Sequence, residues 1–300
     1  MRVLITGATG LVGQELVKQL HEQGVEVNYL TTSRSKIESK SNYKGFFWDP
    51  STSEIDAKSL EGVKTIINLA GASVAQRWTS SHKKAILNSR IDSLNTLKSA
   101  LDSQTHEVEH LISASAIGIY KDSRTRFHEE EDFELGNNFL SDVVVKWEAA
   151  ADEFENIGLD VSKIRIGVVL SNEGGALEKI KQPIKNYVGA PLGDGKQWQS
   201  WIHVLDLARL FIYIKDNRME GVFNGVAPNP VTNEVMTEVI AKQLEKPLIL
   251  PKVPAFALKL MLGEMSTIVL GSQLVSSKKT LSTGFKFRYS QLKPALADLL

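Results

Sequence analysis

Three glycines near the start of the chain have the spacing of a phosphate-binding turn. Residues 6–13 read TGATGLVG, so Gly7, Gly10 and Gly13 form the pattern G-x-x-G-x-x-G between an apolar segment and an amphipathic one. In such a turn the first glycine permits a tight bend, the second lets backbone amides approach a pyrophosphate, and the third permits close packing of a helix. The start of that helix also attracts anions. We therefore predict a dinucleotide site that includes these residues: Gly7, Thr9, Gly10, Leu11, Val12 and Gly13.

The residues after the second predicted strand, 25–30, favour NADP(H) over NAD(H). An acidic side chain at this place binds the ribose 2′-hydroxyl of NAD, whereas an arginine accommodates the 2′-phosphate of NADP. Here the strand leads into TTSR, and no acid occurs before Glu38. We predict that Ser33 and Arg34 bind the 2′-phosphate. The alternative is that Arg34 is a solvated surface charge.

Two more predicted strands end in residues that should reach the same edge of the sheet. Asp49 follows the strand at 45–48 and could face the adenine. Arg77 lies in the loop after the strand at 65–69. It could pair with a cofactor phosphate or an anionic substrate, or form a salt bridge at the start of the next helix. The residues at the exit of that strand are expected beside the cofactor: Leu69, Ala70 and Gly71.

Alternating short strands and amphipathic helices position these residues, and this pattern is typical of a parallel sheet covered on both faces. We predict an α/β fold with a Rossmann-type doubly wound parallel sheet in residues 1–170, which contain six candidate strands and three candidate helices. Beyond this point glycine- and proline-rich loops separate shorter elements. Residues 171–300 are therefore expected to form a smaller α+β substrate domain. A predicted strand at 221–226 could return to the main sheet, which would make the two domains partly interleaved.

The composition excludes several other classes of function. The 35 Lys and Arg residues balance 35 Asp and Glu residues, so no overall field attracts nucleic acid or an anionic membrane. Without cysteine there are no disulfides, thiol nucleophiles or zinc–thiolate sites. No apolar run approaches the roughly 20 residues that span a bilayer, and no secretory signal or metal-ligand spacing is present. We expect a cytoplasmic protein that acts on a small molecule, without a metal.

Motifs along the whole chain resemble the extended short-chain dehydrogenase/reductases. The shared motifs are the glycine turn, the segment 68–71, and the segment 113–115 that ends the fifth predicted strand. A narrower set is similar to the atypical subgroup of NAD(P)-dependent epimerase/dehydratase-like "epimerase family" proteins, with its carboxyl-terminal domain of unknown function. The resemblance implies an oxidoreductase or epimerase of unidentified substrate. The narrower set comprises Arg77-Trp78, Ser89-Arg90, Trp147-Glu148, 189–193, 197–203, 224–230 and 284–287.

The chain departs from the superfamily at the catalytic Ser…Tyr-x-x-x-Lys constellation. There the tyrosine transfers a proton, and the lysine holds the nicotinamide ribose and lowers the tyrosine pKa. Ser115 matches the serine. If Lys146 is the lysine, Asp142 stands in place of the tyrosine; if Trp147 replaces the lysine, Val143 does. The subgroup's Trp-Glu pattern supports the second register, so the usual role of the tyrosine cannot be carried over.

Other side chains could replace the tyrosine. Asp142 and Lys146 form an i,i+4 acid–base pair, which is also a routine surface ion pair. Tyr120 could reach the cofactor, although an aromatic at this place also packs. His203 could carry a proton or cap a helix. Large aromatic side chains could form a wall around the nicotinamide or substrate. The candidates on the substrate side are Trp78, Trp147, Trp201 and His203.

Two hypotheses follow for the function. In the first, the protein is an NADP(H)-dependent oxidoreductase or epimerase-like enzyme that transfers a hydride to or from a carbonyl or alcohol polarised by Ser115. In the second, it is a non-catalytic NADP(H)-binding sensor or regulatory protein, because the tyrosine is missing. A carboxyl-terminal apolar cluster could support a homodimer or pack within the second domain. This cluster consists of Leu258, Leu260, Met261 and Leu262.

Overall fold

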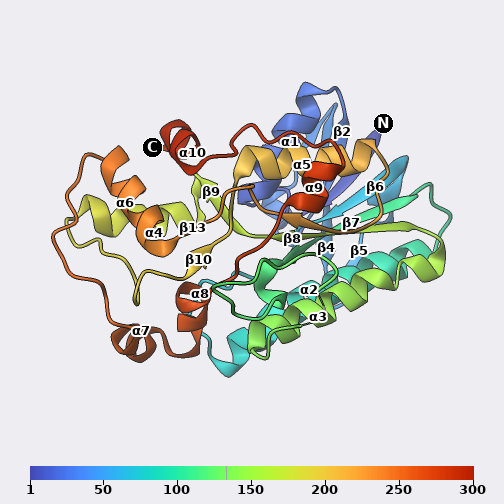
Figure 1. Cartoon of the computed structure of the whole chain (residues 1–300). Helices are drawn as coiled ribbons and strands as arrows, with labels where there is room; N and C mark the ends of the chain where they lie inside the picture. Colours follow the sequence, from blue (N-terminus) through green and yellow to red (C-terminus); the bar gives the residue numbers. More distant parts are fainter. Residues whose placement is uncertain (133) are drawn as a thin grey trace.

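The computed structural model describes residues 1–132 and 134–300, and within these residues a nine-stranded sheet forms the centre of the molecule (Figure 1). Seven neighbouring strands run parallel, in the order β12-β8-β7-β6-β1-β2-β4, and β3 and β5 pair antiparallel with β4. The strands are β1 (Arg2–Thr6), β2 (Glu26–Thr31), β3 (Ser39–Lys40), β4 (Tyr43–Asp49), β5 (Glu54–Ile55), β6 (Val63–Asn68), β7 (His110–Ala116), β8 (Asp160–Ile166) and β12 (Gly221–Gly225).

The sheet is doubly wound, as the sequence predicts. Helices α1 (Leu11–Glu22) and α5 (Val204–Asp216) cover one face, and α2 (Ser80–Asp102) and α3 (Phe139–Asp152) cover the other (Figure 1). The chain order reverses between β1 and β6, because β2 and β4 continue on one side and β7 and β8 on the other. Loops that leave the carboxyl ends of β1 and β6 therefore diverge and open a crevice, which is where doubly wound sheets bind ligands.

Local sequence explains where these elements form and end. Val3, Leu4 and Ile5 are fully buried in β1, as expected for a strand covered on both faces. Gly24 follows α1 with φ +71°, the left-handed conformation that commonly ends a helix. Asn138 begins α3, and its side chain accepts hydrogen bonds from two amides of the first turn. The six strands and three helices predicted in residues 1–170 are all present.

The carboxyl-terminal part has a second apolar core, which includes Leu177, Trp201 and Met236. Two short sheets border it, one of β9 (Val168–Ser171) with β11 (Trp201–His203) and one of β10 (Trp198–Gln199) with β13 (Val231–Thr232). Strand β12 lies beside β8 in the main sheet, so the two parts of the chain are interleaved. The remaining helices are α4 (Gly175–Lys185), α6 (Asn233–Gln243), α7 (Ala255–Leu262), α8 (Thr267–Leu270), α9 (Lys278–Ser282) and α10 (Leu292–Leu299).

The apolar cluster on α7 is largely exposed. Leu258 is buried, but Leu260 is 86% exposed and Met261 is 74% exposed. The expectation that this cluster packs within the second domain is therefore wrong for Leu260 and Met261, because their side chains point away from it. A homodimer that covers them stays a prediction.

Two features are absent from the described 1–132 and 134–300. No helix there has the length and apolar character needed to cross a bilayer. Likewise, these residues contain no cluster of three or more His, Cys, Asp or Glu side chains that could hold a metal ion.

Candidate functional site

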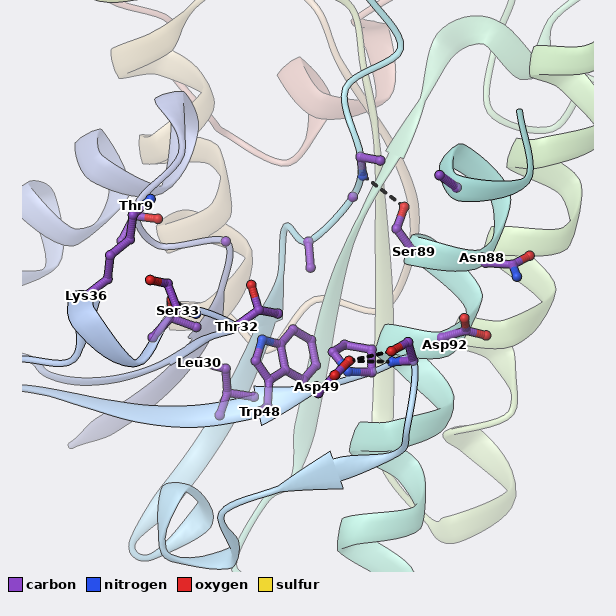
Figure 2. A pocket seen from close by; sticks show the side chains of 18 residues that line it. Thr9, Leu30, Thr32, Ser33, Lys36, Trp48, Asp49, Asn88, Ser89 and Asp92 are labelled. Atoms are coloured by element: carbon purple, nitrogen blue, oxygen red, sulfur yellow. Dashed lines mark hydrogen bonds between the residues drawn. The ribbon is translucent and has the colours of Figure 1, made fainter. Parts of the chain in front are cut away.

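A cleft of about 580 Å³ lies at the crevice between β1 and β6 (Figure 2). Its walls come from the ends of four parallel strands and from α2. In Figure 2 Thr9, Ser33 and Lys36 line one side, Trp48 and Asp49 lie below, and the α2 residues stand opposite. The segments that follow β1, β2, β4 and β6 all contribute to its lining. The α2 residues that line it are Ala85, Asn88, Ser89 and Asp92.

The glycine turn borders this cleft through Gly7 and Thr9, whereas the predicted cofactor residues Gly10, Leu11, Val12 and Gly13 do not line it. Gly7 has φ +70°, and its carbonyl accepts the amide of Gly10 at 3.0 Å. A Cβ on Gly13 would lie 2.3 Å from the Gly7 carbonyl oxygen, so α1 can rest on the turn only because residue 13 is glycine. In the described chain, Leu11, Val12 and Gly13 have amides with no acceptor, and Gly10 supplies no side-chain cap. These unpaired amides fit a pyrophosphate.

Thr6 fixes the other side of the crevice. Its hydroxyl donates to the Asn68 side-chain oxygen at 2.7 Å and accepts the amides of Leu69 and Ala70, each at 3.0 Å. The amide of Leu69 is thus used within the protein, and Leu69 does not line the cleft. Ala70 and Gly71 do line it. The bonds from Thr6 therefore set the spacing between the glycine turn and the residues that follow β6.

The end of β2 carries no acid, and a lysine lies where the sequence pointed to an arginine. Ser33 and Lys36 line the cleft. Arg34 does not: its guanidinium stacks 3.7 Å from the ring centre of Phe47, and it pairs with Glu54 at 3.6 Å. The short 3₁₀ turn Arg34–Lys36 brings Lys36 back toward the cleft. Sequence reasoning missed Lys36, because the turn that aims it leaves no clear spacing signal.

Two other predicted cofactor residues differ in their placement. Asp49 lines the cleft, and its carboxylate accepts the amide and the hydroxyl of Ser51 at 2.9 and 2.7 Å. Arg77 is exposed and lines neither this cleft nor the cavity beside it. Ser89 holds the loop after β6, since its hydroxyl accepts the Ala72 amide at 2.8 Å (Figure 2).

A second cavity of about 250 Å³ adjoins the cleft. Gly71 and Arg90 lie between the two spaces: a Cβ on Gly71 would be 3.0 Å from the guanidinium carbon of Arg90, which lines the cavity. The rest of the wall is mainly apolar and comes from α3, from the ends of β7 and β8, and from the segment around α8. Its members include Val74, Ile117, Leu140, Val143, Val144, Trp147, Ile166 and Ile268.

Helix α3 settles which side chains face this cavity. Val143 and Trp147 are buried and line it, whereas Asp142 and Lys146 are exposed. Asp142 and Lys146 also form no ion pair with each other in the described chain. The register in which Val143 replaces the tyrosine and Trp147 replaces the lysine therefore matches the geometry, and Asp142 and Lys146 lie too far around the helix to reach a ligand there.

Ser115 is held by a buried ion pair next to the cavity. Its hydroxyl donates to Glu148 at 2.5 Å, and Glu148 accepts both the Nε and the Nη2 of Arg165 at 2.8 and 2.9 Å. Burial alone would lower the pKa of Arg165, but the hydrogen bonds and charge of Glu148 raise it above its ordinary value. Ser115 is 2% exposed and does not line the cavity, although the next residue, Ala116, does.

Tyr120 belongs to the same buried network. Its hydroxyl donates to the Asn224 side-chain oxygen at 2.7 Å and accepts Nη1 of Arg165 at 3.0 Å. Burial raises the pKa of Tyr120 to about 12, and its ring stacks on His128. The side chain thus packs in the core instead of reaching the cofactor edge. The sequence did contain a signal for this network, because Arg165 falls within the strand predicted at 161–166, and a charged side chain that is buried in a sheet needs a partner.

Trp147 is the substrate-side candidate that lines the cavity in the described structure. Trp201 is fully buried in the second core, and its indole donates to the Asn229 carbonyl at 2.9 Å. Trp78 packs edge-on against Phe139.

His203 begins α5 and acts as a cap. Its Nδ1 accepts the Leu205 amide at 3.1 Å, and its other ring nitrogen lies 3.2 Å from Asp298. Burial lowers the pKa of His203, which keeps the ring neutral and able to accept that amide. His203 lies in a separate cleft beside α1, away from the cavity.

The doubly wound sheet, the glycine turn and the cleft at the crevice define a Rossmann-type nucleotide-binding protein. The chain belongs to the NAD dependent epimerase/dehydratase family, which matches residues 3–226, and a domain of unknown function (DUF1731) matches residues 253–299. The family and the fold identify it as an NAD(P)-binding extended short-chain dehydrogenase/reductase.

Relatives along the full length carry the same family description. The chain is 39% identical over 299 residues to an epimerase family protein of Staphylococcus haemolyticus, and 40% identical over 303 residues to one of Staphylococcus saprophyticus. Each match covers 99% of this chain and 98% of the relative. Among solved structures, human epimerase family protein SDR39U1 with NADPH is 28% identical with a TM-score of 0.86, covering 100% of this chain and 99% of that one.

Proposed function

We propose that this protein is an NADP(H)-dependent oxidoreductase or epimerase-like enzyme that acts on a small molecule in the cavity beside Gly71. The observation that carries the proposal is the cleft itself. It meets the glycine turn at Gly7 and Thr9, just before the unpaired amides at the start of α1, and a cation, with no acid, lines it at the end of β2. The human relative solved with NADPH supports the choice of NADP(H). The nicotinamide would supply or accept a hydride when bound.

The residues of the cleft divide the work of holding this cofactor. The amides of Leu11, Val12 and Gly13 would bind the pyrophosphate. Ser33 and Lys36 would bind the 2′-phosphate, since both line the cleft at the end of β2. Asp49 lies in the wall where the adenine would be held.

The lining of the cavity offers few groups that could transfer a proton. Val143, at the place of the usual tyrosine, cannot move a proton. Among the described residues that line the cavity, Asp122 has the one carboxyl group. Its Oδ1 already accepts the Ser272 amide at 3.1 Å and the Gln273 side chain at 3.2 Å. A proton that balances hydride transfer would therefore come from Asp122, from water or from the substrate itself.

A non-catalytic NADP(H) sensor is the second candidate. It is favoured by Val143 at the tyrosine position and by the commitment of Ser115 to Glu148. Steady oxidation of NADPH with any member of a panel of aldehydes, ketones and nucleotide sugars would support the enzyme. Tight NADPH binding without turnover across that panel would support the sensor.

Cofactor choice is tested by removing one cation at a time. We expect Lys36→Ala to weaken NADPH binding by roughly 1–3 kcal/mol and to leave NADH binding nearly unchanged, because only NADPH carries the 2′-phosphate. Fluorescence titration with both cofactors measures this. Arg34→Ala is the matched comparison, and an equal loss there would show that Arg34 also reaches the phosphate, as the sequence predicts. Equal weakening of NADPH and NADH by Lys36→Ala would contradict the assignment.

A further inference from the structure

Arg90 lies in the wall of the cavity, and no acidic side chain among the described residues pairs with it. It projects from α2 between Gly71 and Trp147, and its guanidinium carbon lies 4.9 Å from the Trp147 ring centre. Burial lowers the pKa of Arg90 to about 10, and no carboxylate in the described chain acts against that effect. The neighbouring Asp122, in the same wall, forms no ion pair with it. Arg90 is half-buried, and its nitrogens without a partner keep accessible surface, so they are open to a ligand.

The hydrogen bonds of Arg90 leave one edge of its guanidinium free. Nη1 donates to the carbonyls of Ala72 and Ile86 at 3.2 and 2.8 Å. Nε and Nη2 donate to no acceptor in residues 1–132 and 134–300. These two nitrogens form the side of the guanidinium that can bind both oxygens of a carboxylate at once. The fixed Nη1 bonds hold this free edge in place before any ligand arrives.

The remainder of the cavity wall is mainly apolar, which favours a ligand with an apolar body. The side chains of Val74, Ile117, Val144 and Ile166 present apolar surface. The indole nitrogen of Trp147 has no acceptor in the described chain, but it is fully buried and not open to the cavity. A ligand with an anionic end for Arg90 and an apolar body for this surface therefore matches the cavity.

We propose that the cavity binds a small carboxylic acid with an apolar body and that Arg90 binds its carboxylate through Nε and Nη2. The proposal rests on the proposed function in that this acid is the substrate or its product. It does not require turnover to be tested, because binding to the protein can be measured directly.

The experiment compares acids with their uncharged amides. Benzoate, phenylglyoxylate and 4-oxopentanoate are titrated by calorimetry against the protein, each beside its primary amide, with and without NADPH. We expect at least one acid to bind and its amide to bind more weakly. Arg90→Gln should reduce the affinity for the acid by about tenfold to a hundredfold and leave the amide unchanged, because a charge-assisted bond is lost.

Two further variants guard against a purely structural role. Lys84→Gln removes the same charge from an exposed position of the same helix and should change neither ligand. Arg90→Lys keeps the charge but lacks the forked donor, so it should lose part of the preference for the acid. If Arg90→Gln does not fold, as judged by its thermal midpoint, Arg90→Lys decides.

Several results would overturn the proposal. These are equal binding of acid and amide, no binding of any acid at millimolar concentration, an unchanged preference in Arg90→Gln, or displacement of the acid by inorganic phosphate at similar concentration. Loss of NADPH affinity in Arg90→Gln with no change for the acids would assign Arg90 to the cofactor. Failure of NADPH to bind to the unmodified protein would contradict the proposed function alone, since acid binding is also measured without it.

Discussion

The cleft and the cavity beside it meet at Gly71, yet they depend on different kinds of group. One end of the cleft depends on backbone geometry: a turn with positive φ at Gly7, a helix resting on it at Gly13, and unpaired amides beside it. Polar side chains such as Ser33 and Lys36 line the other end. The cavity is formed by side chains drawn from Val74 to Gln273 along the chain. Backbone recognition permits few residue types at fixed spacing, whereas a side-chain wall can be refilled in many ways. Chemistry can thus change in the cavity while the cleft stays the same.

The strongest test of this difference adds one methyl group at the glycine turn and one in the wall of the cavity. Gly13→Ala should abolish NADPH binding, because its Cβ would overlap backbone atoms of Gly7 and Ala8 at 2.3 and 2.6 Å and displace the turn. Gly118→Ala adds the same methyl group in the cavity wall, where it would lie 3.5 Å from Leu140 in ordinary contact. We expect this variant to bind NADPH normally in a fluorescence titration. Normal binding by Gly13→Ala would show that the turn does not depend on close packing.

The same difference decides what the sequence alone could reveal. Apolar runs predicted the parallel strands, and the glycine pattern predicted the turn, because each depends on neighbouring residues. Lys36 escaped notice because a 3₁₀ turn aims it into the cleft. The free donor edge of Arg90 depends on Gly71 and Trp147, which approach it only in the folded chain. Contacts between distant side chains carry no spacing that a sequence pattern can show.

Ser115 illustrates the same limit on the catalytic side. A serine at the end of a strand has the right type for polarising a carbonyl, and its position along the chain matches the superfamily. Its orientation, however, is set by Glu148 and Arg165, which lie 33 and 50 positions further along the chain. The position of Ser115 at the end of a strand was therefore predictable, and its hydrogen bond to Glu148 was not.

Removal of the Glu148–Arg165 ion pair should lower the stability of the protein and leave the cleft unchanged. Arg165→Met leaves Glu148 buried without its partner, so we expect the free energy of unfolding in urea to fall by about 3–5 kcal/mol. NADPH affinity of the folded fraction should change little, because the cleft lies across Gly71. Lys146→Met removes a charge from the exposed side of α3 and should change stability by less than about 0.5 kcal/mol. A similar loss in both variants would mean that the ion pair contributes no more than a surface charge.

Ser115→Ala is the smallest change and tests whether this hydroxyl belongs to the wall or to the chemistry. Glu148 keeps both hydrogen bonds from Arg165 in this variant, so no buried charge loses its partner. We expect urea unfolding to report a loss of about 1 kcal/mol, the usual contribution of one hydrogen bond. NADPH affinity, and any turnover found with the carbonyl panel, should stay within about twofold, since a loss of 0.4 kcal/mol or less is expected at a site the hydroxyl does not touch. A tenfold or larger fall in turnover at unchanged cofactor affinity would instead require the hydroxyl to turn from Glu148 toward the substrate, and the cavity would then contain a polar catalytic group as well as Arg90.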